Sequence, residues 1–272
     1  MSLSRDNEAS FSPVRREDED GVATLTLQSP SSRNALSLAM IEAIISQFRA
    51  IEADRSVRAV ILAGDGPALS SGHDLRELRA HRNDADRGEA FYKRIMARCS
   101  DLMLGIVALP KPVIAAVEGV ATAAGCQLVA ACDLAVCGAD ARFALPGVGI
   151  GLFCSTPLVA VGRAVSRKHA MEMALTGSLY SAEEAERFGL VNRVVPAGEA
   201  LAQARALAVD IAARSPATLA IGKQAFYRQM ELPLGEAYDL ASRAMVDNLA
   251  HPDSGEGIDA FLHKRAPRWE AE

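Results

Sequence analysis

Two segments of the sequence place small residues where a backbone could approach a ligand closely. The first is ALSSGHDLREL at 68–78, and the second is EGVATAAGCQLVAACD at 118–133. Each pattern predicts a loop that runs into the first turn of a helix. Free N–H groups at such a turn, helped by the helix dipole, can stabilise an oxygen atom that develops negative charge. Each segment alone is also typical of tight helix packing, so the chemical interpretation depends on the pair.

Other side chains that could do chemistry give weaker signals. Cys154, Ser155 and Thr156 follow the glycine-rich loop GVGIGLF at 147–153 and could orient a water or a substrate. No base is assigned near them, and an unassisted nucleophile stays protonated at neutral pH, which favours packing and capping roles. The five cysteines form no C-x-x-C pair, so they indicate buried thiols and no metal site. Four histidines lie in polar helical contexts and are predicted to be at the surface: His81, His169, His251 and His263.

The elements that must position these residues alternate between strands and helices. Residues 22–27 alternate in size and polarity, which predicts a half-buried strand, and short β-rich runs predict buried strands at 58–64, 112–117 and 133–137. Ser37 can cap a helix whose apolar residues recur at helical spacing through Ile51. This alternation predicts an α/β layered core. No G-x-G-x-x-G follows the first strand, which disfavours a Rossmann dinucleotide enzyme.

The chain becomes almost wholly helical after about residue 165. Helix 167–176 ends at Gly177, Ser181 and Glu184 form a capping box, and 191–195 predicts one more strand. Helices are then predicted at 198–214, 216–230, 234–249 and 255–265. Such a helical region has few strands to cover, so self-association is predicted. We therefore divide the chain into a disordered tail (1–20), a core (21–197) and a helical region (198–272).

The composition is that of an ordinary globular protein. Of the 272 residues, 50% are hydrophobic and 23% are charged, and the formal net charge is −5. This acidic balance predicts neither a nucleic-acid nor a membrane partner. The longest uncharged apolar stretch, 119–132, is too short to span a bilayer. Residues 1–21 lack the apolar core of a signal peptide and contain an acidic run at 17–20, so a cytoplasmic location is predicted.

Taken together, these segments resemble the crotonase (enoyl-CoA hydratase/isomerase) superfamily over about residues 22–269. The resemblance rests on NALS at 34–37, SSGHDL at 70–75, AAGCQL at 123–128 and FLHKRAP at 261–267. Within the superfamily, SSGHDL, ATAAGCQL and GLFCSTP are most similar to the third group of mitochondrial enoyl-CoA hydratase domain-containing proteins. The resemblance implies a crotonase-like spiral of β-β-α turns followed by a C-terminal helical trimerisation region, with homotrimers that often pair into hexamers.

The resemblance also implies a site for a coenzyme A thioester, with coenzyme A as part of the substrate and no separate cofactor. The backbone N–H groups of His73 and Ala124 would form an oxyanion hole for the thioester carbonyl. The residues implied to line the pantetheine and adenine path are Ala35, Leu36, His73, Asp74 and Leu75. Phe261 and Lys264 of a neighbouring subunit would contact the nucleotide end, although Lys264 alone is more typical of a solvated residue.

The sequence departs from the family pattern at the two acid/base positions. The glutamates that manage the water's protons in hydratases of this family are replaced by Gln127 and Gly147, and neither can titrate. Each acid/base group typically contributes about 10²- to 10⁴-fold, so classical hydration is expected to be weak. The alternatives are a decarboxylation, because GHD at 72–74 also resembles methylmalonyl-CoA decarboxylases, and a non-catalytic acyl-CoA-binding protein.

Overall fold

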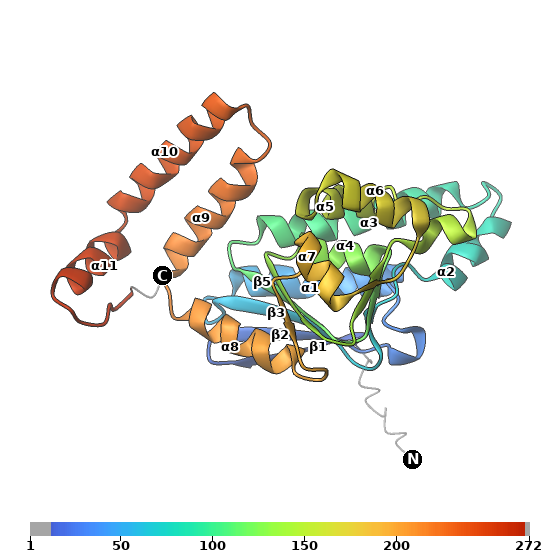
Figure 1. Ribbon diagram of the computed structural model, residues 1–272, viewed down its shortest axis with the longest axis horizontal. Coiled ribbons are helices and arrows are strands. Elements are labelled where there is room, and N and C mark those ends of the chain that lie inside the picture. The colour runs from blue at the N-terminus through green and yellow to red at the C-terminus, as the bar shows by residue number, and fades with distance from the viewer. Residues whose placement is uncertain (1–11, 270–272) are drawn as a thin grey trace, which may run out of the picture.

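The computed structural model describes residues 12–269, and its strands form two sheets (Figure 1). The six-stranded sheet has the order β1-β2-β3-β5-β7-β10. It consists of β1 (Val14–Glu19), β2 (Val22–Leu27), β3 (Ala59–Gly64), β5 (Val113–Val117), β7 (Leu134–Gly138) and β10 (Arg193–Val195). Within it, β1 and β2 are antiparallel, and all other neighbouring pairs are parallel.

The four-stranded sheet consists of short strands in the order β4-β6-β8-β9. These are β4 (Ala68–Ser70), β6 (Val120–Thr122), β8 (Arg142–Ala144) and β9 (Tyr180–Ser181). The first three are parallel, and β9 runs antiparallel to β8.

Helices alternate with the strands in the first part of the chain, and all elements after β10 are helices. The first six α-helices are α1 (Leu38–Ala53), α2 (Leu75–Ala80), α3 (Glu89–Ala108), α4 (Ala124–Ala131), α5 (Pro157–Ala164) and α6 (Arg167–Thr176). The remaining five are α7 (Ala182–Phe188), α8 (Ala200–Ala212), α9 (Pro216–Gln229), α10 (Leu234–Ala250) and α11 (Pro252–Leu262). Three short 3₁₀ turns are η1 (Pro30–Ser32), η2 (His81–Asn83) and η3 (Pro146–Ile150). Within residues 12–269, no helix combines the length and apolarity needed to cross a membrane.

One pattern of elements repeats along the core. A strand of the larger sheet is followed by a short strand of the smaller sheet and then by helix, first as β3-β4-α2, next as β5-β6-α4 and then as β7-β8 with η3 and α5. Each repeat adds a parallel neighbour to both sheets, so the chain winds as a spiral of β-β-α turns. The predicted α/β fold class is therefore confirmed.

The larger sheet is buried on both faces because alternate residues of its strands face opposite layers. In β3, Val60 and Leu62 belong to the main core with the apolar side of α1, whereas Ala59 and Ile61 pack with α8 (Figure 1). Helix α8 presents alanines at every fourth position, Ala200, Ala204, Ala208 and Ala212. Small side chains on one helical stripe let α8 lie close to the sheet.

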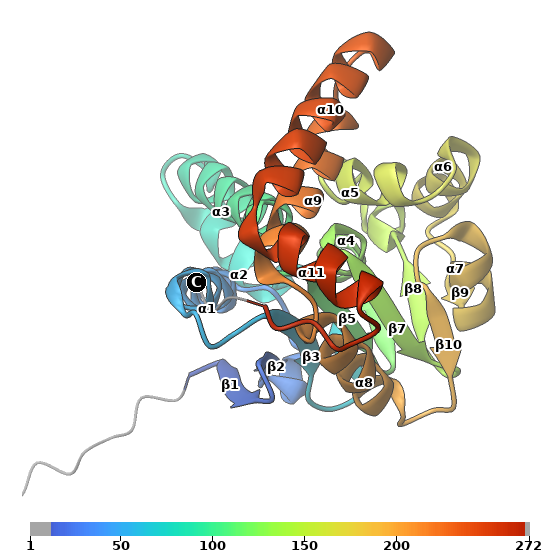
Figure 2. The same cartoon turned by 90° about the vertical axis from the view of Figure 1, so that its left-hand side faces the viewer.

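The position of α8 corrects the predicted boundary of the helical region. The sequence predicts one C-terminal unit over 198–272, but α8 packs on the larger sheet (Figure 2), and only α9, α10 and α11 extend away from the core (Figure 1). The sequence spacing predicts the helices but not what each helix packs against. The alanine stripe of α8 could pack on a sheet or on another helix.

The beginning of the chain also differs from the prediction. Residues 14–19 form β1, which pairs with β2 from Val14↔Leu27 to Glu19↔Val22, so the predicted disordered tail is wrong for these residues. The tail's residues 1–11 lie outside the described part of the chain. Strand β1 is rich in charge because it is an edge strand with mostly solvated side chains.

A buried polar cluster fastens α9 to the core. Lys223 of α9 donates hydrogen bonds to the carbonyl oxygens of Ile106 (2.9 Å) and Lys111 (3.0 Å) and forms an ion pair with Asp133 (2.7 Å). The second oxygen of Asp133 accepts from the Tyr227 hydroxyl (2.9 Å). The side chains of Lys223 and Asp133 are only 7% and 15% exposed, so each depends on the other for compensation of its charge.

Candidate active site

The two small-residue segments singled out in the sequence lie side by side. Strands β4 and β6 pair in parallel, with Ala68 opposite Val120 and Ser70 opposite Ala121. Just beyond the strands, the Thr122 hydroxyl donates to the carbonyl oxygen of Ser71 (3.2 Å). The pairing of these short strands therefore brings the starts of α2 and α4 to the same edge of the smaller sheet.

Glycines allow the two backbones to approach each other closely. A Cβ placed on Gly125 would lie 2.1 Å from the carbonyl oxygen of Ser70, so only glycine fits there. Gly72 has a φ of +91°, and a Cβ placed on it would lie 3.1 Å from the backbone nitrogen of Ala124. His73, which follows Gly72, is consequently next to the first residue of α4.

The backbone amides of His73 and Ala124, which the sequence predicts to form the oxyanion hole, do not donate any of the backbone hydrogen bonds that link these segments. Ala124 is the first residue of α4, so its N–H has no intrahelical acceptor. Leu36 and His73 form a parallel bridge in which the Leu36 amide donates to the Gly72 carbonyl oxygen (2.7 Å). Outside the helices and strands of residues 12–269, no backbone hydrogen bond uses the His73 amide as donor.

Ala123 holds a backbone conformation that sequence reasoning did not anticipate. Its φ of +50° and ψ of −118° lie in a region that L-residues other than glycine rarely adopt. Its amide donates to Ala144 (2.9 Å), and its carbonyl accepts from Gln127 (3.0 Å), so both sides of the residue are held. The strained peptide sets the direction of the Ala124 amide. The only sign of this conformation in the sequence is that α4 begins after an alanine, which has no polar side chain to cap the helix.

The side chain of His73 is held against the backbone of Leu36. Its Nδ1 lies 3.2 Å from the carbonyl oxygen of Leu36, while Nε2 is buried and has no hydrogen-bond partner among the described residues. Burial lowers the pKa of His73 below its usual value of 6.5, and the hydrogen bond to Leu36 offsets only part of this effect.

Neither residue at the expected acid/base positions can exchange a proton. Gln127 is buried (4% exposed), and its Oε1 lies 4.0 Å from the Sγ of Cys99. Gly147 in η3 is tightly enclosed, because a Cβ there would lie 2.5 Å from the carbonyl oxygen of Leu152. A glutamate could enter at position 147 only if the following loop moved.

The thiols near η3 are not activated. Burial raises the pKa of Cys126 to about 12 and also raises the pKa of Cys154, for which a hydrogen bond from Gly147 offsets part of the effect. Ser155 is exposed, and its hydroxyl donates to the carbonyl oxygen of Phe153 at 3.5 Å. Thr156 is half-buried before α5. The five cysteines are all buried and free, and no group of metal-binding side chains occurs within residues 12–269.

The residues expected along the coenzyme A path divide into two groups. Leu36 is fully buried in the core and Ala35 is 8% exposed, so these two could offer a ligand mainly backbone atoms. Asp74 caps α2 by accepting from the Arg76 amide (2.8 Å), whereas Leu75 is 53% exposed. All four adjoin His73 in sequence or through the Leu36–His73 bridge.

The second group, Phe261 and Lys264, is not brought to this edge by the single chain. Phe261 is 83% exposed on α11, and Lys264 is exposed just after that helix. Figure 1 places α11 at the opposite end of the molecule from α2. Within one copy of the chain, these two residues therefore cannot join His73 and Ala124.

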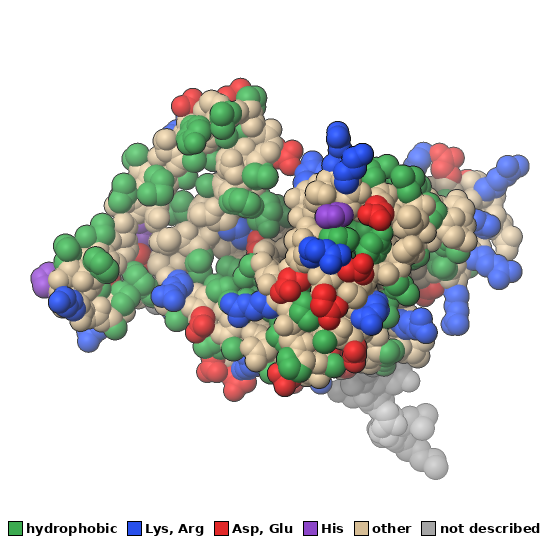
Figure 3. All heavy atoms as spheres, in the orientation of Figure 1, with side chains coloured by type: hydrophobic (Ala, Val, Ile, Leu, Met, Phe, Trp, Pro, Cys, Tyr) green, Lys and Arg blue, Asp and Glu red, His purple; other side chains and the backbone are tan. Residues whose placement is uncertain are grey.

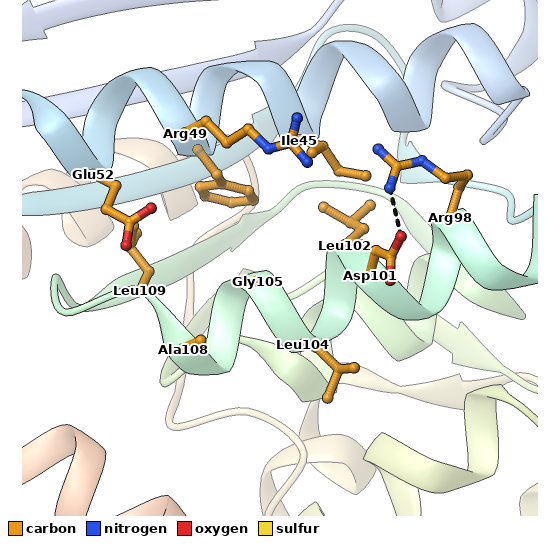
Figure 4. Close-up of a pocket in the computed structure, with 11 residues that line it drawn as sticks. Ile45, Arg49, Glu52, Arg98, Asp101, Leu102, Leu104, Gly105, Ala108 and Leu109 are labelled. Carbon is orange, nitrogen blue, oxygen red and sulfur yellow. Dashed lines mark hydrogen bonds and ion pairs between the residues drawn. The ribbon is translucent and has the colours of Figure 1, made fainter.

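A separate pocket of about 400 Å³ lies between α1 and α3 (Figure 4). Its floor includes Ile45 and Leu102, and its rim includes Arg49 and the ion pair between Arg98 and Asp101 (2.5 Å). No residue of the predicted site lines it. The pocket therefore has no part in the candidate chemistry at the β4–β6 junction.

Comparison with known proteins identifies the family. A family model for enoyl-CoA hydratase/isomerase matches residues 17–272. The chain belongs to the enoyl-CoA hydratase/isomerase family. It is 47% identical over 251 residues to enoyl-CoA hydratase domain-containing protein 3, mitochondrial, of Mus musculus, covering 92% of this chain and 82% of that protein. The predicted resemblance to this group is confirmed.

Two solved structures of the enoyl-CoA hydratase/isomerase family match the whole fold. An enoyl-CoA hydratase from Mycobacterium smegmatis is 48% identical, with a TM-score of 0.89 over 94% of this chain and 98% of that one. Human enoyl coenzyme A hydratase domain-containing protein 3 is 46% identical, with a TM-score of 0.89 over 94% of this chain and 100% of that one. At this coverage and similarity, the fold is that of a crotonase.

The comparisons overturn one prediction. Relatives of this family member from Mus musculus, Rattus norvegicus and Homo sapiens are named mitochondrial, so the prediction of a cytoplasmic location is wrong. That prediction used only the composition of residues 1–21, where acidic and polar residues were taken to exclude a targeting segment.

Proposed function

We propose that this enoyl-CoA hydratase/isomerase family member forms an enolate from an acyl-CoA thioester. The backbone N–H groups of His73 and Ala124 hold the thioester carbonyl oxygen, which gains negative charge when the enolate forms. The observation that supports this proposal is the close approach of Gly72 to Ala124. A Cβ on Gly72 would lie only 3.1 Å from the backbone nitrogen of Ala124. Coenzyme A enters as part of the substrate.

Classical hydration is slow in this proposal. Gln127 can orient a water but cannot take its proton, and Gly147 has no side chain, so the proton transfers of hydration lack their usual groups. The same two residues favour two other candidates. Decarboxylation of a malonyl-type thioester needs the anion hole but no strong base, and a binding protein without turnover needs neither glutamate.

Self-association forms part of the proposal. Helices α9 to α11 expose large apolar side chains, seen in green on the projecting arm in Figure 3. They include Phe226, Met230, Leu234, Tyr238, Met245, Val246, Leu249, Ile258, Phe261 and Leu262. An apolar surface of this kind marks an interaction site. We propose a homotrimer or hexamer in which Phe261 and Lys264 of one copy approach the nucleotide end of the ligand bound to another.

Three assays on the purified protein test the proposed reaction. Hydration of crotonyl-CoA, release of carbon dioxide from malonyl-type CoA esters, and exchange of the C2 hydrogens of butyryl-CoA in D₂O are measured together. We expect exchange at C2 with slow hydration. Binding of all three thioesters with no reaction would favour the non-catalytic candidate, and carbon dioxide release without C2 exchange would favour the decarboxylase. Failure to bind any of the three would contradict the proposed function.

A further inference from the structure

The imidazole of His73 has a defined orientation and tautomer. A carbonyl oxygen can only accept a hydrogen bond, so the Nδ1 that lies 3.2 Å from the Leu36 oxygen must carry the proton. In the neutral ring, Nε2 is then the unprotonated nitrogen with a free lone pair. The backbone of Leu36 thus fixes which nitrogen of His73 is available as an acceptor.

That acceptor is buried without a partner. Of the side-chain atoms described, only His73 Nε2 and His169 Nδ1 are buried polar atoms with no hydrogen-bond partner. Leaving such an atom unpaired destabilises the folded protein, so a native structure that keeps one needs an explanation. The ring of His169, in α6, stacks on that of Phe188 in α7 with ring centroids 3.8 Å apart, and neither helix forms part of the β4–β6 junction. The ring of His73 belongs to the residue whose amide is proposed to bind the thioester.

The other side chains around the junction cannot act as a base. Gln127 does not titrate, and burial keeps Cys126 and Cys154 as thiols. The charged groups of α2 next to His73 are engaged elsewhere: the Asp74 carboxylate accepts from Arg76, and the Glu77 carboxylate accepts from the Leu38 amide (3.0 Å). The first turn of α4 and residues 35–37 contain no charged side chain.

We propose that His73, through Nε2, is the catalytic base that removes and returns the C2 proton of the acyl-CoA substrate. This inference rests on the proposed function. Nε2 takes the proton from C2, and the electrons of the broken C–H bond move to the thioester oxygen held by the two amides. The imidazolium then returns the proton to C2 or, in an unsaturated chain, to C4 while the enolate electrons form the new C–H bond. No oxidant or second reactant is needed.

The surroundings of the ring suit this role. Burial keeps the pKa of His73 below 6.5, so the imidazole is neutral and able to accept a proton at neutral pH. One base can complete both proton transfers of a double-bond shift, whereas hydration in this family uses two glutamates. The proposal therefore assigns an isomerase-type reaction to this member of the family.

The matched variants are His73→Ala and His169→Ala. His73→Ala removes the ring but keeps the backbone amide at position 73, so the anion hole is preserved. His169→Ala removes the other imidazole that has an unpartnered buried nitrogen. C2 exchange of butyryl-CoA in D₂O is followed by mass spectrometry, and binding of butyryl-CoA is measured by calorimetry.

We expect His73→Ala to slow exchange by about 10²- to 10⁴-fold with unchanged binding, and His169→Ala to exchange as the parent does. The parent rate should fall as the pH drops through the lowered pKa of His73, and this acid limb should be absent from the residual rate of His73→Ala. Exchange by His73→Ala at the parent rate would overturn the proposal. If His73→Ala does not fold, His73→Gln decides by the same criteria. Binding of butyryl-CoA by the parent protein without C2 exchange would also overturn the assignment of His73 as the base. If the parent protein does not bind butyryl-CoA at all, the proposed function itself is refuted.

Discussion

Gly125→Ala is expected to slow C2 exchange of butyryl-CoA by about 10²- to 10³-fold, the usual effect of losing one oxyanion-hole donor. The added methyl group would lie 2.1 Å from the Ser70 carbonyl oxygen, and the nearest atoms are the backbone and Cβ of Ser70, so no flexible side-chain end can move aside. Helix α4 must therefore move away from β4, which takes the Ala124 amide away from His73. Overpacking of this kind also lowers the free energy of unfolding by about 1–3 kcal/mol.

The matched control is Gly105→Ala in α3, where a Cβ would meet nothing within 4 Å. This variant is expected to raise the free energy of unfolding by about 0.5–1 kcal/mol through helix propensity and to leave exchange unchanged. Denaturant titration and the exchange assay are run on both proteins. Full exchange activity in folded Gly125→Ala would contradict the proposed contribution of the Ala124 amide.

Lys223→Met is expected to lower the free energy of unfolding by about 3–5 kcal/mol, because it leaves the buried Asp133 carboxylate without its counter-charge. Asp133 would retain only neutral donors, among them the Tyr227 hydroxyl and the Val113 amide (2.7 Å). Two carbonyl oxygens that now accept from Lys223 would also lose their donor. Chemical denaturation measures the change.

Lys93→Met provides the comparison, because Lys93 pairs with Glu89 at the surface with both side chains mostly exposed. An exposed pair of this kind contributes about 0–1 kcal/mol. Equal destabilisation by the two substitutions would show that the Asp133 cluster does not anchor α9.

The sequence predicted the elements whose signals are local. Ser37 caps α1 by accepting from the Met40 amide (3.2 Å), and Ser181 and Glu184 form the predicted capping box of α7. Strands β3, β5 and β7 are predictable because each is a short, largely apolar run, and β2 is predictable because apolar residues alternate along it with smaller or polar ones. The whole smaller sheet was missed, because strands of two or three residues are too short to show any periodicity.

The candidate site was predictable only in part, for a related reason. Glycine-rich segments before α2 and α4 indicated close backbone approach, but the contact of Gly125 with Ser70 depends on the pairing of β4 with β6. The enclosure of Gly147 by Leu152 and the strained backbone of Ala123 are tertiary effects with no residue pattern of their own. The unpaired Nε2 of His73 likewise appears only once Leu36 is placed beside it.

A crystal structure of the protein with butyryl-CoA measures where the thioester oxygen is bound. We expect this oxygen to lie about 2.7–3.1 Å from the backbone nitrogens of both His73 and Ala124. A thioester bound elsewhere, or an oxygen that reaches neither nitrogen, would contradict the account of this site.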